Sequence, residues 1–142
     1  KLAPSAIAVL APFFHGREDA LGAIRVQVLS PLAAQVTLKA WLPAMTVIGA
    51  TWVVIPGLLD ANGKVRGRTF SWTQPKGIGL YAHEALHVVQ YRTDPVAFVV
   101  DGLKGICLSL AHGELYDHEY VAYEQEALAF EKMVRARLEG QQ

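Results

Sequence analysis

Cysteine and net charge are what this 142-residue chain has least of. Its single cysteine excludes an internal disulfide, and the apolar residues around Cys107 predict a small buried hydrophobe. Thirteen basic residues only balance thirteen acidic ones, and no basic block stands out. We therefore expect no nucleic-acid partner. The sequence carries no mark of a compartment or of an oligomeric state.

Apolar residues are abundant instead: they form 52% of the chain, against 18% for charged residues, so a sizeable core can form. The longest uncharged run, 41–59, is long enough for a membrane helix. Prolines and glycines interrupt this run, and its segment 52–55 is typical of a buried strand. We therefore expect no membrane span, and one domain over residues 1–142.

The first half of the chain carries mainly strand signals. Alternation predicts a strand at 24–28, and residues 46–48 and 52–55 predict two short strands or a hairpin. Between them, Ser30-Pro31 has the pattern of a helix start, which predicts a helix to about residue 42. The polar segment 60–67 is typical of an exposed loop.

The second half carries helix signals. Helices are predicted at about 74–92, 95–110 and 117–138, with breaks at Asp94-Pro95 and Gly113. The apolar segment 3–14 predicts a short helix or an arm packed on the body. Strands followed by helices indicate an α+β fold, in which a small mixed or antiparallel sheet packs against the helices.

The chemistry-bearing motif is the H-E-x-x-H sequence His83-Glu84-Ala85-Leu86-His87. Residues four apart share a helix face, so both imidazoles can bind one ion while Glu84 accepts a proton from water. Uncharged neighbours predict that the helix is buried: Leu80, Tyr81, Ala82, Ala85, Leu86, Val88 and Val89. Buried imidazoles and a buried carboxylate need a partner, and a metal ion supplies one. The alternative is a core helix with incidental histidines.

A catalytic zinc site needs a third protein ligand. The last predicted helix carries one stripe that is expected to face the core: Tyr116, Tyr120, Tyr123, Ala127, Phe130, Val134 and Leu138. Glu124 lies about 60° from Ala127 on the helical wheel, and Glu126 lies about 100° away. Glu124 is therefore the better placed carboxylate, while Glu126 is expected in water. The small side chain of Ala127 would let the two helices approach closely.

These motifs resemble the gluzincins, metallopeptidases with H-E-x-x-H on one helix and a glutamate ligand on a later helix. Their short bacterial members often have H-E-L-x-H-V-V-Q and then E-x-E-A. This chain has His83-Glu84-Ala85-Leu86-His87-Val88-Val89-Gln90 and Glu124-Gln125-Glu126-Ala127. The resemblance covers about residues 24–131. It implies a zincin-like fold, with a sheet packed against the central H-E-x-x-H helix, and zinc-dependent hydrolysis of a peptide or protein substrate.

The resemblance also implies residue roles. It implies zinc as the cofactor, Glu84 as the general base and, as metal ligands, His83, His87 and Glu124. Many gluzincins carry an aspartate four residues after the ligand glutamate, which supports a ligand histidine; here that position is Leu128. Glu131, Asp117 or a backbone carbonyl are the alternatives for this support.

Amide hydrolysis further needs a donor for the developing oxyanion. Tyr116 and Tyr120 are the main candidates, and Tyr91 and His118 are two others. In the metallopeptidases that the chain resembles, an edge strand pairs with extended substrate. Segment 52–55 has either that role or the role of an internal core strand.

Two other functions fit the same residues. The first is a non-catalytic, metal-containing binding or structural module of a larger secretion or injection assembly. The second is a membrane-embedded protease built on the uncharged run 41–59. An open coordination position in a groove would speak against the first, and solubility without detergent would speak against the second.

Overall fold

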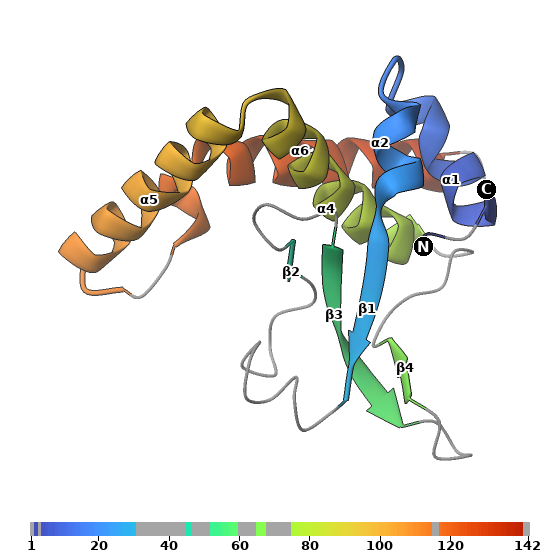
Figure 1. The fold of residues 1–142 in the computed structure, drawn as a ribbon, viewed down its shortest axis with the longest axis horizontal. Coiled ribbons are helices and arrows are strands. Elements are labelled where there is room, and N and C mark those ends of the chain that lie inside the picture. Colours follow the sequence, from blue (N-terminus) through green and yellow to red (C-terminus); the bar gives the residue numbers. More distant parts are fainter. Residues whose placement is uncertain are drawn as a thin grey trace.

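The computed structural model describes residues 2, 4–30, 45–46, 52–59, 65–67, 75–114 and 117–140 (Figure 1). The elements, in chain order, are α1 (Pro4–Leu10), the 3-10 turn η1 (Ala11–Phe13), α2 (Glu18–Ala23), β1 (Arg25–Leu29), β2 (Met45–Thr46), β3 (Trp52–Leu59), β4 (Val65–Gly67), α4 (Pro75–Thr93), α5 (Pro95–Ala111), η2 (His118–Tyr120) and α6 (Ala122–Glu139). The helix predicted at 30–42 lies outside the described residues, apart from its first position.

Local sequence signals place the ends of α4 and α5 where we predicted them. Asp94 caps α5 by accepting a hydrogen bond from the backbone N–H of Ala97 at 2.9 Å, and Pro95 stands at the first helical position. Gly113, with a φ of 82°, follows the end of α5. The last helix starts later than predicted, because Val121 is extended and separates η2 from α6.

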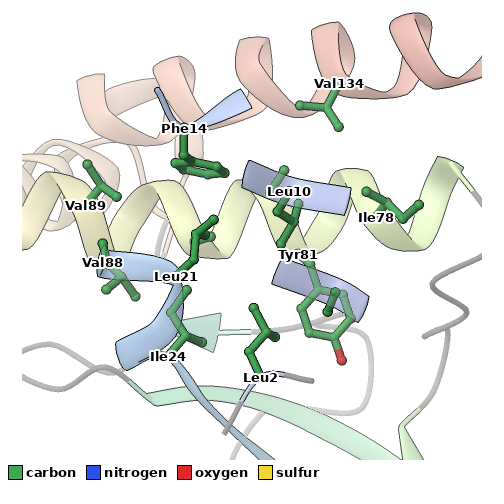
Figure 2. Close-up of a cluster of buried hydrophobic side chains, with 14 residues drawn as sticks. Leu2, Leu10, Phe14, Leu21, Ile24, Ile78, Tyr81, Val88, Val89 and Val134 are labelled. Atoms are coloured by element: carbon green, nitrogen blue, oxygen red, sulfur yellow. The ribbon is translucent and has the colours of Figure 1, made fainter. Parts of the chain in front are cut away.

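Helix α4 lies at the centre of the described core. Its buried side chains pack against α6 on one side and against α1 and α2 on the other. Figure 2 shows Val134 pointing from α6 toward α4, and Leu10 of α1 close to the same helix. The predicted stripe of α6 is confirmed at Ala127 and Val134, which are both fully buried.

The predicted α+β, zincin-like fold class is wrong. The structure describes side chains for the helices and for β1, but not for β2, β3 and β4. Among the residues with described side chains, 81% are helical and β1 is the one strand, so no sheet forms among these residues. The physical reason lies at the N-terminus. The segment before residue 24 folds into α1 and α2, and these helices supply core side chains against α4. Helices therefore occupy a face of α4 where a packed sheet was expected.

The extended segments pair through their backbones, and β1 and β3 extend away from the helices (Figure 1). Strand β1 pairs in parallel with β3, with Val26 opposite Val53, while β2 and β4 pair with β3 in antiparallel fashion. Both backbone edges of Val53 and Val54 are therefore occupied. This pairing argues against substrate addition at Val53 and Val54.

Two smaller expectations have clear outcomes. In the part of the chain that the structure describes, no helix has the length and apolarity needed to cross a bilayer. Cys107 is exposed, which corrects its predicted burial. The reason is the rotation of α5, which turns Gly105 and Ser109 toward the body instead.

Gly105 is where α5 meets the segment before α6, and it generates a prediction. A Cβ at Gly105 would clash with Cγ2 of Val121, whereas one at Gly102 would have no neighbour within 4 Å. We expect Gly105→Ala to lower the free energy of unfolding by about 1–3 kcal/mol through overpacking. Gly102→Ala, the matched control, should leave it unchanged or raise it by up to about 1 kcal/mol. Denaturant unfolding of both variants measures this, and equal stabilities would contradict the packing.

Candidate metal centre

Four polar side chains of α4 are buried: His83, Glu84, His87 and Gln90, none more than 8% exposed. All four face an interior in which an unpartnered polar group is costly. The neighbouring helix α6 comes close to α4 because Ala127, fully buried, has almost no side chain. Their proximity brings the glutamates of α6 within reach of the histidines.

The three predicted ligands come together in the structure. The Nε2 atoms of His83 and His87 lie 3.1 Å apart. The carboxylate of Glu124 approaches both: Oε2 lies 3.3 Å from Nε2 of His83, and Oε1 lies 3.3 Å from Nε2 of His87. The three residues offer ligand atoms that all lie within 4.8 Å of one another. The two histidines, four residues apart on α4, and Glu124, on the α6 face predicted from the helical wheel, thus lie close together.

The dimensions of this triangle suit zinc. In a tetrahedral site with bonds of about 2.0–2.1 Å, the ligand atoms are separated by roughly 3.3 Å. The separations of 3.1 and 3.3 Å in this structure are close to that value. Two imidazoles and one carboxylate are also a donor set that zinc accepts in catalytic sites, where a fourth position stays open. The residues present therefore fit the ion.

The outer nitrogen of His83 meets a charged pair on α6. Its Nδ1 lies 3.3 Å from Oε2 of Glu131, and Oε1 of Glu131 lies 2.5 Å from Nη2 of Arg135. Burial lowers the pKa of His83, but Glu124, Glu131 and Glu84 outweigh it and raise the pKa to about 9. The same negative field that holds a proton on His83 favours a divalent cation.

The outer nitrogen of His87 meets an uncharged partner on its own helix. Nδ1 of His87 lies 2.8 Å from Oε1 of Gln90. The Nε2 amide of Gln90 donates onward to Oε2 of Glu126 at 2.9 Å and to the backbone carbonyl of Tyr123 at 3.3 Å. Glu126 is exposed, and its described contact with the site is the one with Gln90.

The remaining predicted residues have different positions. Glu84 is buried beside His83, whose pKa its charge raises.

Tyr120 stacks on His112 with ring centroids 5.0 Å apart. Tyr91 packs edge-on against Phe98, so packing is the described contact of both tyrosines. Tyr116 and the side chain of His118 lie outside the described residues. Asp117 accepts a hydrogen bond from the backbone N–H of Glu119.

Three residues at the site were given no role by the sequence reasoning. Gln90 and Arg135 had local signals: Gln90 lies three residues after His87, and Arg135 lies four after Glu131, which are spacings that face each other on a helix. Phe98 of α5 had none. Its ring lies 5.8 Å from that of His87 and 5.3 Å from that of Tyr123, and it closes one side of the site.

Comparison with protein-family models, with curated proteins and with solved structures finds no match for this chain. The likeness to the gluzincins therefore rests on the motif residues, and what it implies about function is argued from the site.

The choice between Glu124 and Glu126 can be tested by zinc binding. A metal that binds only the folded chain stabilises it, by about 2.7 kcal/mol at a zinc concentration of 100 times Kd. We expect Glu124→Ala to lose most of this gain, and Glu126→Ala, the matched control, to keep it. Thermal unfolding with and without zinc measures the gain in each variant. The reverse ranking would move the third ligand to Glu126.

Proposed function

We propose that this chain is a zinc-dependent hydrolase of peptide bonds, acting on peptide or protein substrates. The observation that carries the proposal is the convergence of three donors, His83, His87 and Glu124, with ligand atoms within 4.8 Å of one another. Buried Glu84 lies next to the first ligand in sequence. Metal ligands with an adjacent carboxylate are the parts that metal-assisted hydrolysis requires.

Each part has a defined role in the proposed reaction. When bound, zinc supplies Lewis-acid chemistry, because it lowers the pKa of a coordinated water to about 7 and polarises a carbonyl oxygen. Glu84 accepts the proton of the attacking water while the water oxygen bonds to the carbonyl carbon. The C–N bond then breaks, and the proton passes from Glu84 to the leaving amine.

The surrounding protein serves the same reaction by holding the imidazoles. Nδ1 of His87 lies at hydrogen-bond distance from Gln90, and Nδ1 of His83 lies 3.3 Å from Glu131, so both Nε2 atoms lie toward the common centre. Phe98 packs against the ring of His87 and limits its rotation. Preorganised ligands reduce the rearrangement needed when the site binds its ion.

Glu84→Gln separates catalysis from metal binding. The amide has nearly the same size but accepts no proton, so we expect zinc content and melting temperature to stay near those of the unchanged chain. Hydrolysis of a fluorescently labelled, unfolded protein should fall by about 10²–10⁴-fold. The exposed Glu119→Gln serves as the control and should keep full activity. Equal turnover by both variants would remove Glu84 from the mechanism.

The same assay decides between hydrolysis and the non-catalytic module. A hydrolase releases new amino termini from the unfolded substrate only with zinc present, and a chelator stops the release. A zinc-loaded chain that releases none over many hours, at several pH values, would instead have a binding or structural role.

A further inference from the structure

Exposed apolar side chains gather on one helix of the described structure. Six large hydrophobic residues among those described are exposed, and five of them lie on α5: Val96, Val100, Leu103, Ile106 and Leu110. The exposed Cys107 lies among them. Apolar residues scattered singly over a surface are normal, whereas a contiguous group marks contact with a partner. None of these residues belongs to the proposed metal centre.

The opposite face of α5 holds the helix on the body. Gly105 and Ser109 are buried there, and a carboxylate oxygen of Asp101 accepts a hydrogen bond from the backbone N–H of Tyr123 at 2.9 Å. On a helical wheel Gly105 lies roughly 160° from Cys107. In Figure 1, α5 lies at the outer edge of the described helices. A second helix can therefore lie along the exposed face without displacing the elements that α5 contacts.

The exposed face has the spacing of a coiled coil. Intervals of four, three, four and three residues separate Val96, Val100, Leu103, Cys107 and Leu110, which we call the seam of α5. This alternation is that of the d and a positions of a heptad, beginning with a d position. A β-branched residue at a (Val100) with leucine at d (Leu103 and Leu110) favours two parallel helices. A buried core helix can show a similar pattern, and the exposure of the seam in the structure excludes that reading.

The charge on α5 favours the same parallel arrangement. Lys104 is the one exposed charged residue of the helix, and it stands at an e position, beside the seam. In a parallel pair an e residue lies opposite a g residue of the other helix. The g residues are Val99 and Ile106, so the two lysines do not meet. In an antiparallel pair e positions face each other, and the two lysines would repel.

We propose that the seam of α5 binds the seam of a second copy of this chain, as a parallel two-stranded coiled coil. Cys107 then lies opposite its counterpart in an a layer, and Leu103 and Leu110 lie opposite theirs in d layers. The inference does not depend on the proposed hydrolysis.

The area of the seam sets the strength of this pairing. A fully exposed Val or Leu side chain offers on the order of 100–150 Å² of apolar surface. The large side chains of the exposed face are between 39% and 71% exposed, so they offer roughly 300–400 Å² per copy. The pair therefore buries less than the about 1,200 Å² of a stable interface. We expect a weak dimer that dissociates on dilution.

Sedimentation of the full chain over a range of concentrations measures the dimer. We expect the average mass to rise with concentration toward twice that of the monomer. Leu103→Lys places two like charges in one d layer and should weaken the dimer by about tenfold or more. Met133→Lys is the matched control, because Met133 is an exposed apolar residue of α6 outside the seam. This control should leave the dimer unchanged.

The single cysteine reports the orientation of the two helices. Because Cys107 is the one cysteine of the chain, a short bis-maleimide can join two copies only through it. We expect a covalent dimer from the unchanged chain and from Met133→Lys, and much less of it from Leu103→Lys. Leu110→Lys is a second seam variant with the same expected result, for the case in which Leu103→Lys does not fold as judged by circular dichroism.

Three results would overturn the proposal. The first is a chain that stays monomeric at every concentration, including one that instead binds phospholipid vesicles through α5. The second is a dimer that persists unchanged in the folded seam variants. The third is a dimer without the Cys107 cross-link, which excludes the parallel pairing.

Discussion

The burial of polar side chains on one central helix is the constraint on which the described structure depends. Helix α4 carries His83, Glu84, His87 and Gln90 into an interior where each must find a partner or destabilise the fold. Helix α6 supplies partners for both histidines and for Gln90. The contact between α4 and α6 is therefore at once part of the hydrophobic core and the source of the candidate site.

Helix α6 packs in the core and also supplies carboxylates to the site, and both features follow one spacing of seven residues. Ala127 and Val134, seven residues apart, are buried in the core, while Glu124 and Glu131, also seven apart, reach the two sides of His83. Seven residues amount to almost two full turns, so each pair forms a row along the helix. One row provides the close apolar approach and the adjacent row provides the carboxylates. A shift of α6 by one residue would separate the ligand from the histidines.

Short-range sequence patterns predicted which residues of the site lie close together, but they predicted only part of the fold. Proline, aspartate and helical spacing marked α4 and α5, and the wheel position of Glu124 indicated its approach to the histidines. The partner of α4 could not be read in the same way, because an apolar segment such as 3–14 does not reveal which surface it covers. A sheet was therefore expected where α1 and α2 lie. Glu131 was one of three alternatives, since its choice depends on how α4 and α6 cross.

The measurement that tests the account most directly is anomalous scattering at the zinc absorption edge from a crystal of the chain grown with zinc. The account predicts one strong peak per chain, between α4 and α6, within about 2.0–2.2 Å of Nε2 of His83, Nε2 of His87 and a carboxylate oxygen of Glu124. Glu131 should lie outside bonding distance of the ion, against Nδ1 of His83. No peak at this position, or a zinc ion bound by other residues, would contradict the metal centre and the function proposed from it.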